Sequence, residues 1–515
     1  SCFYDFLLIV SPQPNKSITS SFEVIISCFM SYKYFAIGII CLLVSIVSCR
    51  RDDYYEGNDV ELAFSVDTLR IDTVFTTLGS ATRWFKVYNK KDQPILVDIK
   101  LRQEKNAFFR INADGVKGPL VENLEIAGGD SIYIFVEVTV DPDQPLSLSP
   151  FILEDQIDID ANGKIFTAHL EAWGQNANYI TPPEGKGKRF LYSCDFGQRI
   201  WDDPKPYVIY GILFVDSCTL VLPAGTKIHV HGGIVRDSTT LYNDGLLVFL
   251  KDGRIETLGT PESPVIIQGD RLEEEYADVK SQWVGMLFWH ESRENKLNHT
   301  IIKNSIVGIR ADSLAEVSLY GCEISNTGGP AVIGRHATIY GANCLFYDNA
   351  SYGLQLTYGG KYRFDYCSVA NYEGQNEAVI LTDFYCSDPL CIKGALINRL
   401  DASFTNCIFT GSDRDEVGLI HVSENPSDFN YSFDHCSFRV DELLDAKNFP
   451  NFFDNCTECI NLQSNDKLFL DQRKDDYRLD TMSVVLLKAK QLSGVTGDIL
   501  GKIRKSVPDQ GCYEF

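Results

Sequence analysis

Apolar and polar residues alternate in short segments along the second half of the chain, and these segments recur about every 22 residues. One position of the repeat is held by a small thiol or hydroxyl residue, and the members of this series are Thr300, Cys322, Cys344, Cys367, Cys407, Cys436 and Cys456. An apolar residue stands two positions later in six of the seven segments. Because residues two apart share one face of a strand, the pattern predicts short β-strands.

Each repeat also contains turn signals. Four positions after the repeated residue stand side chains that tolerate a left-handed backbone, and they are Asn304, Asn326, Asp348 and Asn371. A coil of this length holds about three strands and three turns, and it buries its inner face only against neighbouring coils. Helical repeats need long amphipathic runs, and leucine-rich repeats need a frame that is absent here. We therefore expect a solenoid over 207–482, with the repeated thiols stacked as a buried column.

The preceding region, 61–178, contains longer alternating strands without this repeat. Turn signals at 89–92 and 162–163 separate them. About seven strands in such a length are typical of a β-sandwich of immunoglobulin type, which would serve as a spacer or contact a partner. A linker and the N-terminal cap of the solenoid are expected over 179–206. Residues 483–515 are expected to cap the other end, with an amphipathic helix over 483–492.

The N-terminal region predicts export. Lys33 precedes an apolar run from Phe35 to Val47, which is short for a membrane span, and Cys49 follows. This arrangement resembles a bacterial lipoprotein signal over 30–48, with Cys49 as the lipidated first residue, a tether over 49–60 and a mis-called upstream segment over 1–29. An uncleaved anchor is the alternative. The charges at 50–53 resemble the surface-export signal of Bacteroidota lipoproteins, or they are a solvated charge run. The resemblance implies a lipid anchor in the outer membrane, with the chain facing the cell exterior.

Two further segments resemble a known fold. The run TLVLPAGTKIHVHGGI over 219–234, and the closing pair DILGKIR over 498–504 and PDQGCYEF over 508–515, are similar to the ends of bacterial parallel β-helix proteins with the pectate-lyase-like fold. The fold class that we expect is therefore all-β, with an Ig-like β-sandwich followed by a right-handed parallel β-helix. This fold carries lyases, hydrolases and non-catalytic surface proteins alike, so it implies no single activity.

The net charge limits the classes of ligand that the chain can bind, and the cysteines bear on disulfides and metal sites. The formal net charge of −23 disfavours nucleic acid, whose phosphates need a basic surface, and leaves neutral glycans, cationic ligands or proteins open. Cys386 and Cys391 fall in an irregular insertion between two repeats and are predicted to form a disulfide. Cys456 and Cys459 form a single CxxC motif, and zinc would require a second pair of ligands.

No catalytic set is evident in the repeats. Hydrolases need two positioned carboxylates, and lyases need a base beside a cation that neutralises the substrate carboxylate. The candidate ligand or partner surface is an acidic loop with nearby aromatic residues, namely Asp270, Arg271, Glu273, Glu274, Glu275, Tyr276, Trp283 and Trp289. It is read as a solvated loop, a calcium or partner site, or a catalytic loop. His229 and His231 share a strand face and are weak metal candidates. No cofactor is expected, apart from calcium at this loop.

These observations favour a cell-surface lipoprotein that acts as a non-catalytic binding or scaffold component. It would bind a glycan or dock onto an outer-membrane protein complex. A polysaccharide lyase or glycoside hydrolase with a divergent site on the β-helix is one alternative. An adhesin is another.

Overall fold

The computed structural model describes residues 53–75, 82–102, 108–138, 151–175, 177–182, 189–236, 241–272, 274–388, 391–392 and 394–515. The predicted export signal and the lipidation residue Cys49 lie outside this part of the chain. Within it, no helix has the length and apolar character needed to cross a bilayer.

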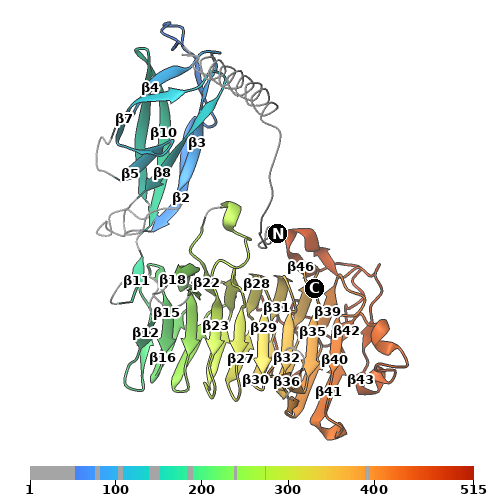
Figure 1. The fold of residues 1–515 in the computed structure, drawn as a ribbon. Coiled ribbons are helices and arrows are strands. Elements are labelled where there is room, and N and C mark those ends of the chain that lie inside the picture. Colours follow the sequence, from blue (N-terminus) through green and yellow to red (C-terminus); the bar gives the residue numbers. More distant parts are fainter. Residues whose placement is uncertain are drawn as a thin grey trace, which may run out of the picture.

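A β-sandwich occupies the first part of the described chain (Figure 1). One five-stranded sheet consists, in spatial order, of β1 (Leu62–Phe64), β3 (Arg83–Asn89), β8 (Ser131–Val138), β5 (Phe109–Ala113) and β6 (Val116–Lys117). The other consists of β2 (Thr68–Phe75), β10 (Lys164–Gln175), β9 (Phe151–Ala161), β4 (Ile95–Leu101) and β7 (Leu120–Ile126). The first sheet is antiparallel throughout, whereas β2 and β10 pair in parallel.

Alternation along the strands builds the core of the sandwich. In β4 every second residue from Ile95 to Leu101 is buried, and β8 buries alternate residues from Ile132 to Val138. These residues belong to one apolar cluster that draws on both sheets. The opposite faces of the same strands therefore point to solvent, as strand geometry requires.

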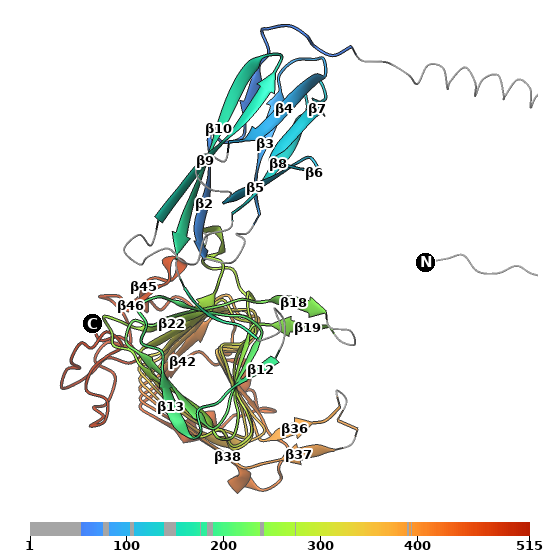
Figure 2. The ribbon, with the colours of Figure 1, turned by 90° about the vertical axis from the view of Figure 1, so that its left-hand side faces the viewer.

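Three parallel sheets form the second part, a parallel β-helix that Figure 2 shows along its axis. The 11-stranded sheet contains β11 (Asn178–Ile180), β14 (Tyr207–Ile209), β17 (Lys227–Val230), β22 (Val265–Gly269), β25 (Thr300–Lys303), β28 (Glu323–Thr327), β31 (Leu345–Asn349), β34 (Ser368–Asn371), β39 (Ile408–Gly411), β42 (Ser437–Phe438) and β44 (Ile460–Asn461). The 9-stranded sheet contains β12 (Arg189–Tyr192), β15 (Ile212–Val215), β20 (Leu246–Phe249), β23 (Gly285–Phe288), β26 (Ile309–Ala311), β29 (Val332–Arg335), β32 (Leu354–Thr357), β35 (Val379–Thr382) and β40 (Val417–Ile420).

The 10-stranded sheet completes each coil, with β13 (Gly197–Ile200), β16 (Cys218–Pro223), β21 (Gly253–Leu258), β24 (Asn295–Asn298), β27 (Glu316–Tyr320), β30 (Thr338–Ala342), β33 (Gly360–Asp365), β38 (Leu400–Thr405), β41 (Phe429–Asp434) and β43 (Cys456–Thr457). Two hairpins leave the helix on one side (Figure 2), β18 (Gly233–Arg236) with β19 (Leu241–Asp244), and β36 (Phe384–Cys386) with β37 (Ala395–Ile397). A coil thus supplies one strand to each sheet in turn, and the all-β, parallel-helix prediction is confirmed.

The predicted column of thiols is present. Cys322, Cys344, Cys367, Cys407 and Cys436 are buried and unoxidised, and strand pairing places each one over the next. The predicted register fails at the last coil. Ser437 pairs with Ile460, so Cys459 continues the column, whereas Cys456 pairs with Phe433 in another sheet. The distance in sequence from Cys436 to Cys459 matches the repeat better than the distance to Cys456 does.

The turn prediction holds at three of its four positions. Asn304, Asn326 and Asp348 have positive φ angles of 65°, 52° and 51°. These residue types adopt a left-handed backbone more readily than other side chains, which is why they occupy this corner of the coil.

The C-terminal end of the helix is closed by aromatic residues and not by the segment predicted to cap it. Phe433, Phe438, Phe449 and Phe452 plug the last coil beside the short 3-10 turns η4 (Glu442–Leu444) and η5 (Phe452–Asn455). Aromatic rings here pack edge to face, as in Phe438 against Phe452 at 5.2 Å. The plug removes the apolar end of the column from water.

The expected helix over 483–492 is absent, since these residues form turns and irregular chain. The C-terminal segment lies instead along the flank of the 11-stranded sheet, where Leu345, Ala370 and Ile408 point outward and pack against it. Its backbone forms hydrogen bonds with side chains of the β-helix. The Asn406 side chain both donates to Lys490 O (2.8 Å) and accepts from Lys490 N (2.9 Å). In an α-helix these backbone N–H and C=O groups would bond to each other and would not be free to bond with Asn406. The segment also holds β45 (Phe469–Asp471), η6 (Gln472–Lys474) and β46 (Asp476–Leu479).

Candidate functional site

The acidic loop predicted as a ligand surface contacts other parts of the chain. Asp270 Oδ2 lies within hydrogen-bond distance of His231 Nδ1 (2.7 Å), and the Arg271 guanidinium lies 3.7 Å from the centre of the Tyr276 ring. Glu275, within η2 (Glu274–Tyr276), forms an ion pair with Arg83 of the sandwich. Glu273 lies outside the described residues, as does the side chain of Glu274. The loop therefore joins the two domains, which sequence reasoning did not anticipate.

The two tryptophans do not form one surface with this loop. Trp283 is only 1% exposed, belongs to the helix core, and donates its indole N–H to Lys303 O at 2.9 Å. Its proposed role in ligand contact is therefore wrong, because the ring packs inside the coil. Trp289 follows β23 and remains exposed.

His229 and His231 differ in environment. His229 is buried, and burial lowers its pKa to about 4. His231 stacks on Tyr210 at 4.5 Å and pairs with Asp270. Among the described residues there is no group of three His, Cys, Asp or Glu side chains that could hold a metal ion.

The described part of the chain contains two disulfides. Cys386 and Cys391, paired in the sequence prediction, are bonded within the β36–β37 hairpin. Cys194 and Cys218 form a second bond between neighbouring coils at the start of the helix. The only signal for this second pair was that neither residue falls in the thiol column.

An aromatic surface covers the outer face of the first sandwich sheet. Trp84 on β3 pairs across the strands with Phe135 on β8, which in turn pairs with Asn112 on β5. Trp84 is 50% exposed and Phe135 is 37% exposed. Tyr133 meets the Trp84 ring edge to face at 5.0 Å and stacks on Phe135 at 5.9 Å. These rings form a continuous platform that faces outward.

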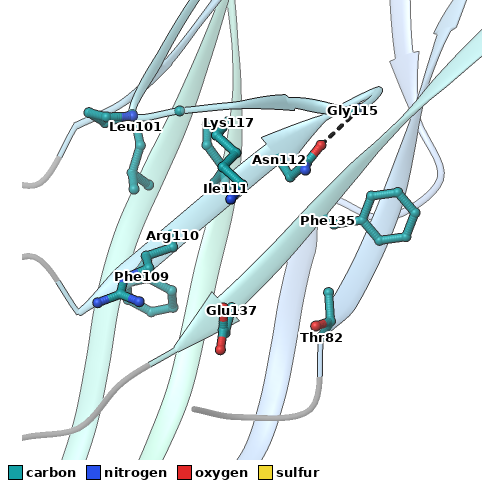
Figure 3. A pocket seen from close by; sticks show the side chains of 12 residues that line it. Thr82, Leu101, Phe109, Arg110, Ile111, Asn112, Gly115, Lys117, Phe135 and Glu137 are labelled. Atoms are coloured by element: carbon teal, nitrogen blue, oxygen red, sulfur yellow. Dashed lines mark hydrogen bonds between the residues drawn. The ribbon is translucent and has the colours of Figure 1, made fainter.

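A pocket of about 760 Å³ lies beside the platform (Figure 3). Leu101, Phe109 and Ile111 supply apolar wall, and Phe135 links the pocket to the platform. Arg110 and Glu137 are cross-strand neighbours at its edge and offer hydrogen-bond donors and acceptors side by side. The remaining lining residues are Thr82, Asn112, Gly115, Lys117, Gly118 and Pro119.

Local hydrogen bonding shapes one wall of this pocket. The Asn112 side chain accepts from Gly115 N at 2.8 Å and so stabilises the turn between β5 and β6 (Figure 3). The sequence contained a usable signal for the platform, because Trp84, Tyr133 and Phe135 occupy strand positions that alternate with the buried residues. Exposed aromatic residues that lie next to one another, unlike single ones, mark an interaction surface.

A pair of carboxyl groups forms a second candidate on the helix. Asp348 lies near the end of β31, at a corner of the coil, and Asp475 follows η6 in the C-terminal segment. Burial, together with a hydrogen bond to Asp475, raises the pKa of Asp348 to about 7. Tyr477 donates to Asp348 Oδ1 at 3.5 Å, and Lys280 pairs with Glu373 at 2.6 Å nearby.

The chemistry of this pair is that of a shared proton. A carboxyl group that stays protonated near neutral pH meets one requirement of a general acid. Hydrolases, however, place their two carboxyl groups about 5 to 10 Å apart, to leave room for the sugar and the water. Asp348 and Asp475 are in hydrogen-bond contact and so are closer than that. The platform and the pocket beside it therefore offer the better-formed site for a ligand.

No known protein-family model matches the chain, and no curated protein matches it. Among solved structures it is similar to the catalytic unit of a GH87 α-1,3-glucanase from Streptomyces thermodiastaticus strain HF3-3, at 8% identity over 69% of this chain and 73% of that one, with a TM-score of 0.21. A GH87 α-1,3-glucanase catalytic domain in complex with nigerose is 12% identical over 69% and 80% of the two chains, with a TM-score of 0.16.

A family 123 glycoside hydrolase from Clostridium perfringens is 10% identical over 26% of this chain, with a TM-score of 0.19. The chain covers 30% of that protein's length. Similarities of this size say nothing about activity. The fold follows from the strand pairing described above.

Proposed function

We propose that the protein is a non-catalytic binding component, held on the outer membrane by a lipid on Cys49, whose sandwich domain binds a neutral glycan. The observation that carries this proposal is the exposed row of Trp84, Tyr133 and Phe135 beside a pocket edged by Arg110 and Glu137. The anchor is inferred from sequence alone. Incorporation of a labelled fatty acid by cells, and its loss in a Cys49→Ala chain, tests it.

Sugar rings match the chemistry of this surface. Their C–H faces pack on aromatic rings, and their neighbouring hydroxyl groups pair with adjacent donors and acceptors. Arg110 provides donors and Glu137 provides acceptors within one cross-strand pair. A net charge of −23 disfavours long polyanions, which supports a neutral chain of sugars.

The β-helix then serves as a rigid support for the sandwich. Its three sheets run through successive coils without interruption, and the Arg83–Glu275 ion pair connects it to β3, next to Trp84. Sites on such rigid elements lose little entropy when a ligand binds.

Binding of the full chain to an array of neutral glycans tests the proposal. We expect Trp84→Ala and Phe135→Ala each to weaken binding of the best ligand about tenfold, because each removes one of the three rings of the platform. Trp289→Ala is the matched control, since Trp289 is equally exposed but lies on the helix. Unchanged affinity in the sandwich variants, or loss in Trp289→Ala, would contradict the assignment.

A glycoside hydrolase is the second candidate, favoured by the raised pKa of Asp348. Release of reducing ends from polysaccharides by the wild-type chain, abolished in Asp348→Asn, would establish it. Binding without release of reducing ends supports the first proposal.

A further inference from the structure

The last coil differs from the others in one inward-facing position. Three residues before each member of the thiol column, earlier coils carry apolar residues that pair from strand to strand, namely Leu297, Leu319, Gly341, Phe364, Phe404 and Phe433. In the last coil this position is Cys456, which pairs with the buried Phe433. Cys456 and Cys459 therefore point to the same side, toward the core.

A tight turn brings the two thiols together. Glu458, between them, has a positive φ of 49°, as the residue before the column has in earlier coils, such as His435 at 51° and Asn406 at 60°. The Cys456 thiol donates to Phe452 O at 3.7 Å and the Cys459 thiol donates to Thr457 O at 3.5 Å. The two side chains are close enough to shift the pKa of one another. Both pack against the core yet remain partly exposed, whereas the other unoxidised cysteines of the described residues are buried.

The surroundings favour the thiolate of Cys459. The neighbouring side chains of Cys436 and Cys456 lower the pKa of Cys459, and the contact with Cys459 raises the pKa of Cys456. A thiol whose pKa is lowered attacks disulfides as the thiolate. The residues that the structure describes also include two disulfides, as is typical of proteins from oxidising compartments.

We propose that Cys456 and Cys459 are a redox-active dithiol that closes to a disulfide by exchange with an external disulfide. The Cys459 thiolate attacks one sulfur of the external disulfide and releases the first thiolate, leaving a mixed disulfide on Cys459. Cys456 loses its proton and attacks the Cys459 sulfur, which releases the second thiolate. The chain loses two electrons and two protons, and the external disulfide becomes two thiols.

Cys436 is the competing partner for Cys459, because it lies directly beneath it in the column. Its sulfur is buried, accepts from Cys407 N at 3.4 Å and donates to Phe404 O at 3.4 Å. An incoming disulfide cannot reach a sulfur enclosed in this way without opening the column. The exposed pair within the last coil therefore reacts first.

Oxidised glutathione is the probe. The full chain is purified under reducing conditions, exposed to oxidised glutathione, alkylated, digested with trypsin and analysed by mass spectrometry. Peptide 448–467 carries Cys456 and Cys459 and no other cysteine, whereas Cys436 lies on peptide 415–439. We expect peptide 448–467 to lose two hydrogen atoms in most molecules and to take up no alkylating agent.

Variants separate this reaction from adventitious oxidation. Cys456→Ser is expected to retain a stable glutathione adduct on Cys459. Cys436→Ala is expected to give the same closed peptide 448–467, but more slowly, because the contact that lowers the pKa of Cys459 is lost. A cross-link between peptides 415–439 and 448–467 would overturn the proposal. So would two cysteines that remain open to alkylation after oxidation. Hydrogen exchange at β43 and β44 provides a readout of the folded state and is expected to slow on closure.

Discussion

At the scale of single residues, burial decides which carboxyl groups have a shifted pKa. Glu416 is fully buried between neighbouring coils, and burial raises its pKa to about 8, even with Arg439 at 3.7 Å. Burial also raises the pKa of Asp348, and the neighbouring Asp475 raises it further. Folding thus makes both carboxyl groups harder to ionise than they are in the unfolded chain.

This effect predicts a pH dependence of stability. Between the unfolded pKa near 4 and the folded pKa of about 7, the folded chain holds a proton on Asp348 that the unfolded chain has lost. Stability therefore falls as pH rises through this window. Asp348→Asn lacks this dependence, and we expect it to gain about 1 to 2 kcal/mol relative to wild type between pH 4 and pH 8, allowing for partial exposure.

Urea unfolding at the two pH values measures this difference. Asp252→Asn, which changes an exposed carboxyl in a turn of the same helix, is the control and is expected to follow the wild type. Parallel pH profiles for Asp348→Asn and wild type would show that the shared proton does not affect stability.

At the scale of elements, the C-terminal segment is held on the helix by a buried cation. Arg504 is 6% exposed and donates to Asn343 Oδ1 at 2.7 Å and to Gly511 O at 2.9 Å. Its guanidinium also lies 3.7 Å from the centre of the Tyr366 ring and reaches the buried Glu514 at 3.4 Å. The closing sequence motif therefore holds the C-terminal segment against the flank of the 11-stranded sheet.

Removing this cation is expected to release the segment. Arg504→Ala removes the buried charge partner of Glu514 and leaves only the half-exposed Lys505 at 3.6 Å, which costs about 3 kcal/mol. Limited proteolysis should then cut within residues 462–515 much faster than in wild type. Arg473→Ala, at an exposed arginine of the same segment, is expected to behave as wild type. Equal cleavage rates for the two variants would show that apolar packing alone holds the segment.

At the scale of the whole molecule, the acidic loop joins two domains that the sequence presents as separate units. Arg83 lies on β3, next to the aromatic platform, and Glu275 projects from the helix. Partly exposed ion pairs stabilise by only about 0 to 1 kcal/mol and weaken with salt. This pair is therefore suited to orienting the domains rather than to stabilising either one.

A charge reversal tests this role. We expect Arg83→Glu to widen the distribution of interdomain distances in small-angle scattering, with no change in the unfolding midpoint of either domain. The double variant Arg83→Glu with Glu275→Arg restores the opposite charges and should narrow the distribution again. The same broadening in the double variant would mean that other contacts orient the sandwich.

Local patterns predicted the repeat, the thiol column and the bonded Cys386–Cys391 pair, because each depends on residues within one or two coils. The helix expected over 483–492 failed for a different reason. Its apolar residues pack against strands that are far away in sequence, such as β31 and β39. The apolar pattern of the segment therefore reflects these contacts and not the buried face of an α-helix. The aromatic platform was missed because only the pairing of β3 with β8 brings Trp84 and Phe135 together.

What the sequence by itself determined is the stacking of short strands, since period-two alternation in coils of constant length leaves one way to bury the inner faces. What only the tertiary structure decided is which outward-facing residues meet, because strand order and the course of the C-terminal segment are long-range choices. Trp84 beside Phe135, Asp348 beside Asp475 and Glu275 beside Arg83 all depend on those choices. The groups available for binding or reaction were therefore set by folding, not by local pattern.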